Sequence, residues 1–278
     1  MLREIASGVK TQIGKKVHNR ELMTDLALSA FFADGHILLT GPTGIGKTAW
    51  ARELSYAFGL TFAYDWLMKE YPTDIKFSQI YMAKQLSQAS PQIETMLLGS
   101  MCNTTHTCEL PLPEPFFLIG TKDNDDILSN SLSDRFMISL TVPYPGLSAE
   151  KQILQLHNEN STPHISSLPV CNLEAILHAK EEVTNVRVEE PVYNYIISII
   201  ETTRRVGAVT TGASPRGSIA LLKSAKAYAA IQGRDFVTTD DVQIMALPVL
   251  RHRIKLNPDA IKEGIHPDQI IEGILAGR

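Results

Sequence analysis

A run of residues near the start of the chain has the types and the spacing needed to hold phosphate. The run follows the pattern G-x-x-x-x-G-K-[ST] and consists of Gly41, Pro42, Thr43, Gly44, Ile45, Gly46, Lys47 and Thr48. Glycines allow backbone N–H groups to wrap around phosphate oxygens, the lysine reaches the β- and γ-phosphates, and the Thr48 hydroxyl can ligate Mg²⁺. The motif predicts a phosphate-binding loop (P-loop) for a nucleoside triphosphate.

The segments around this loop predict the elements that must position it. An apolar run at residues 36–40 predicts a strand before the loop, and residues 48–58 have a helical pattern after it. Short apolar segments bounded by turn residues predict further buried parallel strands at residues 60–64, 80–83, 115–121 and 137–142. We therefore expect an α/β fold with a parallel sheet of about five strands covered by helices.

The second half of the chain has a different pattern. The sequence Pro143-Tyr144-Pro145-Gly146 interrupts the strand signals, and helical patterns dominate after it. Helices are predicted at about residues 149–157, 173–182, 190–204, 215–232 and 239–247. The sequence predicts two domains, an α/β domain over residues 1–146 and a small all-helical domain over residues 147–278.

Composition restricts the class of protein. The 278 residues carry a net charge of −4 without a dense Lys/Arg cluster, so a nucleic-acid-binding face is not indicated. The chain lacks an apolar run of about 18 residues and its first 20 residues lack a signal-peptide core, which favours a cytoplasmic protein without membrane insertion. Three unevenly spaced cysteines suit a reducing compartment. Cys102, His106 and Cys108 offer three zinc ligands without a matching fourth, and we interpret them as part of a loop.

Several segments outside the P-loop together match the pattern of one protein family. In the first half they are Ile13-Gly14, Gly35-His36-Ile37-Leu38-Leu39, Tyr71-Pro72-Thr73-Asp74-Ile75 and the strand at 115–121. In the second half they are Thr203-Arg204, Gly212-Ala213-Ser214-Pro215-Arg216, Gly233-Arg234-Asp235-Phe236-Val237, Asp240-Asp241-Val242 and Leu250-Arg251-His252-Arg253. With these segments in this order, the chain resembles the MoxR family of AAA+ ATPases along nearly its whole length.

This resemblance implies a fold, a ligand and an assembly. It implies an ATP-binding αβα domain with a helical lid, assembled into a ring, usually a hexamer, with nucleotide between neighbouring subunits. Ile13 and Gly14 fall in the family's N-terminal signature and are implied as nucleotide contacts. Arg216 matches the sensor 2 arginine, which contacts the γ-phosphate from the lid, and Arg135 matches the arginine finger that reaches into the adjacent subunit. In both roles a guanidinium stabilises charge on phosphate oxygens. Taken alone, Arg135 could equally be a surface arginine paired with Asp134.

The chain departs from the family pattern where hydrolysis is carried out. P-loop ATPases hold the Mg²⁺ water shell with a carboxylate at the end of a neighbouring strand, and AAA+ proteins add a Glu that polarises the attacking water. Aligned on Ala89 and Pro91, the run 80–91 puts Lys84 at the Asp position and Gln85 at the Glu position. A cation there competes with the metal, and an amide cannot take a proton from water. We therefore expect ATP to bind with weakened Mg²⁺ binding.

Two further departures lie nearby. The family's sensor 1 sequence T-Q-N-P becomes Thr121-Lys122-Asp123-Asn124, so that either Asp123 or Asn124 takes the place of the sensor asparagine. Between Ile75 and Ile80 only residues 76–79 remain, whereas family members carry a longer segment that projects towards the ring pore. The nucleotide-binding parts are retained, while the parts for hydrolysis and for pulling on clients are altered.

Two functions from different classes fit these residues. The first is a regulatory or chaperone-like subunit that binds ATP, hydrolyses it poorly, and works in a homo- or hetero-oligomeric ring. The second is an active MoxR-type ATPase that couples hydrolysis to maturation or remodelling of a partner, commonly a protein with a von Willebrand factor A domain in this family. Neither the client nor the ring stoichiometry follows from the sequence.

Overall fold

Five parallel strands form the sheet that carries the P-loop. In this computed structural model, residues 1–17, 20–67, 74–101, 112–158 and 168–277 are described. The strands are β1 (Ile37–Thr40), β2 (Phe62–Trp66), β3 (Ile80–Lys84), β4 (Phe117–Lys122) and β5 (Ile138–Thr141). They lie in the order β2-β3-β4-β1-β5, with every neighbouring pair parallel. The α/β class and the parallel five-stranded sheet predicted from the sequence are confirmed.

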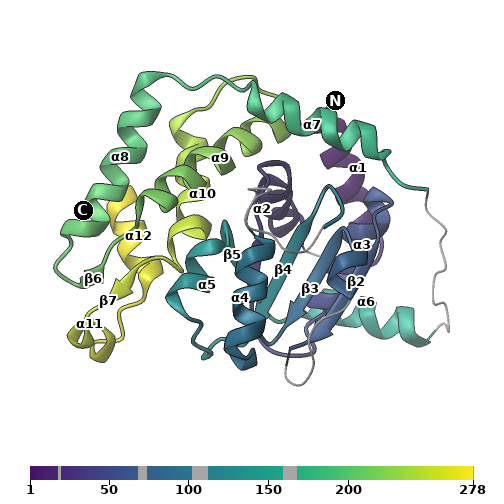
Figure 1. Ribbon diagram of the computed structural model, residues 1–278, viewed down its shortest axis with the longest axis horizontal. Helices are drawn as coiled ribbons and strands as arrows, with labels where there is room; N and C mark the ends of the chain where they lie inside the picture. The colour runs from purple at the N-terminus through teal and green to yellow at the C-terminus, as the bar shows by residue number, and fades with distance from the viewer. Residues whose placement is uncertain (18–19, 68–73, 102–111, 159–167, 278) are drawn as a thin grey trace.

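Helices cover both faces of this sheet because strand side chains alternate between them. Ile37 and Leu39 of β1 belong to the apolar core formed with α1 (Leu2–Gly14), α2 (Glu21–Phe32) and α3 (Lys47–Phe58). Leu38, between them, belongs to a second apolar cluster formed with α4 (Pro91–Ser100) and α5 (Asn130–Arg135). The alternation produces the αβα layers visible in Figure 1.

The rest of the chain is largely helical, as predicted. Its helices are α6 (Leu147–Asn158), α7 (Leu173–Thr184), α8 (Glu190–Arg205), α9 (Pro215–Ile231), α10 (Thr239–Leu250), α11 (Pro258–Lys262) and α12 (Pro267–Leu275). A short antiparallel ribbon of β6 (Val209–Thr211) and β7 (Lys255–Leu256) adds to them, which the all-helical prediction did not include. In Figure 1, α8 to α12 lie beside the sheet on the left, while α6 lies on the right.

The apolar core does not stop at residue 146. It runs from α1 and α2 into α7, α8, α9, α10 and α12, and α9 packs directly on α2. The division into domains at residue 146 therefore stays a prediction about chain organisation. Within the described residues, no helix has the length and apolarity required to cross a lipid bilayer.

Candidate functional site

The P-loop has the geometry of an anion-binding loop. It connects the end of β1 to the start of α3, and Gly46, the residue before the helix, has φ +90°. At Gly41 a Cβ atom would lie 2.4 Å from the Val142 carbonyl oxygen, so only glycine fits there. No side chain caps the N-terminus of α3. Its first N–H groups are therefore available to phosphate oxygens, with the positive end of the helix dipole behind them.

The Lys47 side chain lies against the P-loop backbone. Its Nζ donates hydrogen bonds to the carbonyl oxygens of Gly41 and Pro42, the second at 3.0 Å. Burial lowers the pKa of Lys47, and the nearby charge of Asp123 opposes this shift. The ammonium group therefore already lies among the backbone atoms that form the phosphate cradle.

A cavity of about 310 Å³ opens beside the P-loop at the carboxyl ends of the strands. Its walls come from the P-loop and from the ends of β2, β3 and β4. The lining residues are Thr43, Gly44, Gly46, Lys47, Thr48, Ala49, Trp66, Met82, Lys84, Gln85, Thr121, Lys122 and Asp123. The residues matched to the family's Asp and Glu, Lys84 and Gln85, thus lie in the wall of the P-loop cavity.

Lys84 is held by two aromatic rings of the edge strand. Its Nζ lies 3.5 Å from the ring centroid of Tyr64 and 5.0 Å from that of Trp66, both on β2. Such cation–π contacts hold an ammonium group by the negative face of the ring. Burial and the charge of Arg52 lower the pKa of Lys84. The amine therefore leans towards the sheet edge.

Gln85 follows β3 in an unusual backbone conformation, with φ +55°. Its backbone N–H donates to Thr121 Oγ1 at 3.2 Å, which ties the end of β3 to β4. Its carboxamide offers a hydrogen-bond donor and an acceptor to the cavity, but it is a far weaker base than a carboxylate.

At the end of β4, Asp123 and Lys122 both line the cavity, but the Lys122 ammonium group is held by its own loop. Thr43 Oγ1, in the P-loop, donates a hydrogen bond of 3.4 Å to Asp123 Oδ1. Lys122 Nζ donates instead to the carbonyl oxygens of Asp123, Asn124 and Asp126, at 3.1, 3.2 and 2.7 Å. Asn124 is exposed. Of the two sensor 1 candidates, Asp123 is the one beside the P-loop.

The donor atoms in this cavity suit Mg²⁺. The hydroxyl of Thr48 and the carboxylate of Asp123 both line it, and hard oxygen ligands of this kind are what Mg²⁺ prefers. In the described parts of the chain, this cavity included, no group of three or more His, Cys, Asp or Glu side chains is arranged to hold a metal, so phosphate oxygens and water would complete the shell. The loop residues Cys102, His106 and Cys108 lie outside the described residues, as does the Tyr71-Pro72-Thr73 part of the matched segment.

Two predicted nucleotide contacts are not brought to the P-loop cavity. Ile13 and Gly14 line a separate cavity of about 170 Å³ with residues of α2 and with Gln152 of α6. The Ile13 side chain is buried in the apolar core of α1. Their predicted role as nucleotide contacts stays untested.

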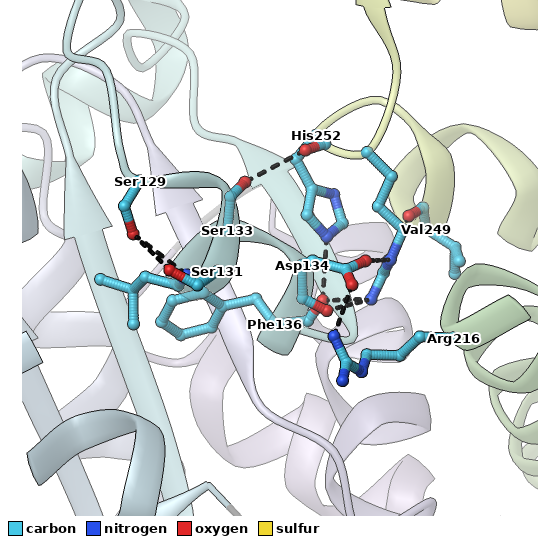
Figure 2. Close-up of polar contacts among 10 residues, drawn as sticks. Ser129, Ser131, Ser133, Asp134, Phe136, Arg216, Val249 and His252 are labelled. Carbon is cyan, nitrogen blue, oxygen red and sulfur yellow. Dashed lines mark hydrogen bonds and ion pairs between the residues drawn. The ribbon is translucent and has the colours of Figure 1, made fainter. Parts of the chain in front are cut away.

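Of the two predicted arginines, Arg216 lies beside Asp134, the residue that precedes Arg135 (Figure 2). Arg216 Nη1 donates to Asp134 Oδ2 at 2.6 Å, and the buried Arg253 donates to Asp134 Oδ1 at 3.1 Å. Arg135 is half-buried and forms no hydrogen bond or ion pair with any residue that the structure describes. Asp134 is therefore paired with two lid arginines, and the alternative pairing with Arg135 does not occur.

Strand direction separates Asp134 and Arg135 from the P-loop. β1 and β5 run parallel, with Ile37 opposite Ile138 and Thr40 opposite Thr141. The P-loop follows β1 at the carboxyl edge of the sheet, whereas Asp134 and Arg135 precede β5 at the amino edge. The two edges are separated by the length of a four-residue strand, roughly 13 Å. Neither Arg135 nor Arg216 lines the P-loop cavity of its own chain.

Sequence reasoning missed three residues of these sites. Tyr64 and Trp66 contact Lys84 because β2 pairs with β3, with Trp66 opposite Lys84. Arg253 belongs to a matched segment, but its contact with Asp134 joins residues 119 positions apart. Neither contact has a local sequence signal, since both depend on which elements become neighbours.

Comparison with known proteins gives likenesses along the whole chain. Residues 201–274 match the family model of the AAA lid domain. The uncharacterized protein YeaC of Bacillus subtilis is 34% identical, over 90% of this chain and 87% of its own length. Chaperone MoxR1 of Mycobacterium tuberculosis is 25% identical, over 95% of this chain and 79% of its own. The crystal structure of a Cytophaga hutchinsonii protein assigned as an ATPase has a TM-score of 0.89 and 25% identity, covering 99% of this chain and 94% of that one.

Proposed function

Because this chain belongs to the MoxR family of AAA+ ATPases, we propose that it is an ATP-binding regulatory or chaperone-like ring subunit whose hydrolysis is slowed at the end of β3. The observation that carries this proposal is the pair Lys84 and Gln85 in the wall of the P-loop cavity. Members of the family bind ATP with Mg²⁺ and typically form rings. The proposal concerns what this chain does with the nucleotide once it is bound.

The P-loop supports binding. Backbone N–H groups at the start of α3 and the ammonium of Lys47 would hold the β- and γ-phosphates. To do so, Lys47 exchanges its contacts with the carbonyl oxygens of Gly41 and Pro42 for phosphate oxygens. Mg²⁺, held through the Thr48 hydroxyl, would neutralise phosphate charge.

The end of β3 argues against fast hydrolysis. A water that attacks the γ-phosphate needs a base or an orienting carboxylate beside it, and the Gln85 amide cannot accept the proton at neutral pH. Lys84 offers no oxygen ligand to Mg²⁺, and its amine is engaged by Tyr64 and Trp66. Binding is expected to survive, because the P-loop contacts do not use either residue.

The arginines support a ring. Arg135 and Arg216 lie near Asp134 at the amino edge of the sheet, whereas the P-loop lies at the carboxyl edge. Arg135, the matched arginine finger, would therefore stabilise phosphate charge on a neighbouring subunit, and this chain would lend it to an active partner in a mixed ring. The contact of Arg216 with the γ-phosphate stays a prediction from its sensor 2 position. A client with a von Willebrand factor A domain and a cytoplasmic location are parts of the same proposal.

The test measures ATP binding and ATP turnover on the same purified sample. Lys47→Ala serves as the control, since it removes the phosphate-binding lysine and exposes any contaminating ATPase. We expect ATP to bind to the unmodified chain and turnover to stay at the level of the Lys47→Ala sample. Turnover that disappears in the Lys47→Ala variant would show a working ATPase and contradict the proposal.

An active ATPase that remodels a partner is the second candidate. It is favoured by the retention of the whole P-loop and of both arginines, and by the name of the relative Chaperone MoxR1. In that case another group must position the attacking water in place of Gln85. The same turnover measurement separates the two candidates.

A further inference from the structure

Asp123 is a carboxylate in the wall of the P-loop cavity. It follows β4, which lies between β1 and β3 in the sheet, so the residue after β4 faces the P-loop. Thr43 of the P-loop donates a 3.4 Å hydrogen bond to its Oδ1. A negative side chain therefore stands where bound ATP would bring more negative charge.

Two lysines of the cavity wall, Lys47 and Lys122, lie close enough to Asp123 for its charge to oppose the lowering of their pKa by burial. Both ammonium groups, however, donate their hydrogen bonds to backbone carbonyl oxygens. The Lys84 amine lies over the rings of Tyr64 and Trp66. Lys122 Nζ donates its hydrogen bonds to three carbonyl oxygens of its own loop. A carboxylate beside a triphosphate is unfavourable unless a cation lies between them. Once ATP is bound, Lys47 is one such cation, and a metal ion between Asp123 and the phosphates would be a second.

The turn that carries Asp123 is firmly held. Asp126 Oδ2 accepts hydrogen bonds from the Asp123 backbone N–H at 3.1 Å and from Ser87 Oγ at 2.6 Å. These bonds lower the pKa of Asp126, so its carboxylate stays ionised and keeps the turn together. A side chain on a backbone fixed in this way is preorganised, which is what a metal ligand requires.

We propose that Asp123 supplies the protein carboxylate for the Mg²⁺ of bound ATP, from the end of β4, in place of the carboxylates that β3 lacks. The inference rests on the proposed function, since it requires bound ATP. Mg²⁺ keeps several water molecules and takes one or two carboxylates together with phosphate oxygens. Asp123 is the carboxylate among the residues that line this cavity, and Thr48 supplies a hydroxyl at the start of α3.

The competing explanation is that Asp123 merely replaces the sensor 1 asparagine and repels the γ-phosphate. The two explanations make opposite predictions for Asp123→Asn. As a metal ligand, Asp123 is needed for the gain in affinity that Mg²⁺ brings. As a repulsive substitute, its replacement by Asn tightens ATP binding equally with and without Mg²⁺.

The experiment measures ATP affinity by isothermal titration calorimetry, in excess EDTA and in excess Mg²⁺, using the full chain. The matched control is Asp125→Asn, which removes the same charge from an exposed side chain in the same loop. For Asp123→Asn we expect tighter binding of metal-free ATP and a Mg²⁺ enhancement reduced roughly tenfold or more. The Asp125→Asn variant is expected to keep the enhancement of the unmodified chain.

Each other outcome has a definite meaning. An unchanged Mg²⁺ enhancement in Asp123→Asn overturns the inference and leaves ATP binding intact. Failure of the unmodified chain to bind ATP in either condition overturns the proposed function and this inference with it. If Asp123→Asn does not fold, Asp123→Glu takes its place, because it keeps the charge but lengthens the side chain. For Asp123→Glu we expect the gain in ATP affinity on adding Mg²⁺ to fall, while the affinity for metal-free ATP stays unchanged. An unchanged gain contradicts the inference.

Discussion

The proposed function places Lys84 and Gln85 at the family's Asp and Glu positions, and this gives a direct prediction at the scale of single residues. On that assignment, Lys84→Asp combined with Gln85→Glu would place a metal ligand and a base at the end of β3. We expect ATP turnover to rise by about 100-fold or more, since base and electrostatic contributions are each of that order. The measurement is steady-state phosphate release.

The control for this prediction is the same double change with Lys47→Ala added, which should return turnover to background. A folded double variant that binds ATP without gaining turnover would count against our assignment of Lys84 and Gln85. It would point instead to the short segment between Ile75 and Ile80 as the cause of slow hydrolysis.

How well the site residues could be predicted depends on how local their signals are. The P-loop is contiguous, so its sequence alone predicts its geometry. The positions of Lys84 and Gln85 follow from the family pattern, and both residues do line the P-loop cavity. The Lys84 contacts with Tyr64 and Trp66 could not be predicted, because they arise from the pairing of β2 with β3.

At the scale of elements, His36 joins the start of β1 to β4. Its Nδ1 accepts a 3.1 Å hydrogen bond from the Leu118 backbone N–H, which requires that nitrogen to be deprotonated. Burial, followed by the charge of Lys180, lowers the pKa of His36 to about 4, while Asp34 opposes the shift. The connection between the two strands therefore depends on a neutral imidazole.

This arrangement predicts a pH dependence of stability. Because the pKa of His36 is lower in the folded chain than in the unfolded one, the unfolded chain binds more protons between about pH 6.5 and pH 4. Stability is therefore full above about pH 6.5 and falls as the pH drops towards 4, by about 3 kcal/mol from this group.

Urea unfolding at pH 7 and at pH 4 measures the effect. His36→Asn removes the titration while its side-chain oxygen can still accept the Leu118 N–H, so this variant should lose less stability over the interval. His178→Asn, at an exposed position of α7, should behave like the unmodified chain. Equal losses in the unmodified chain and in His36→Asn would show that His36 titrates normally.

The elements themselves were predicted where their patterns are strong. The strand before the P-loop and the helices after residue 146 correspond to β1 and to α6 to α10. Helix α1 is absent from the prediction, although its apolar residues recur at helical spacing and so carry a sequence signal. In three dimensions they form one buried face, made of Leu2, Ile5, Ala6, Val9 and Ile13. What the sequence does not predict is the set of partners of this face, which are α2, α3 and α9.

At the scale of the whole molecule, the lid is bound to the amino edge of the sheet. Arg253 is buried and donates to the carbonyl oxygens of Phe136 and Met137, at 2.6 and 3.0 Å, as well as to Asp134. His252 Nε2 also lies 2.9 Å from the Phe136 carbonyl oxygen (Figure 2). Because Arg216 pairs with the same Asp134, two lid arginines connect the lid to the segment before β5.

This arrangement predicts that each nucleotide-binding site is formed by two chains. Lys47→Ala should damage the half of the site at the carboxyl edge of one chain, and Arg135→Ala should damage the half at the amino edge of the next. With ATP and Mg²⁺, we expect the unmodified chain to form ring-sized assemblies in native mass spectrometry, and each variant alone to form smaller ones.

A mixture of the two variants tests the same contact. It can form one kind of intact contact, between the P-loop of the Arg135→Ala variant and Arg135 of the Lys47→Ala variant, so it should give two-subunit species. Arg205→Ala, at an exposed arginine of α8, is the matched control and should assemble like the unmodified chain. Full assembly by Arg135→Ala alone would contradict the prediction. It would show that contact between Arg135 and the P-loop of a neighbouring subunit is not needed to form the ring.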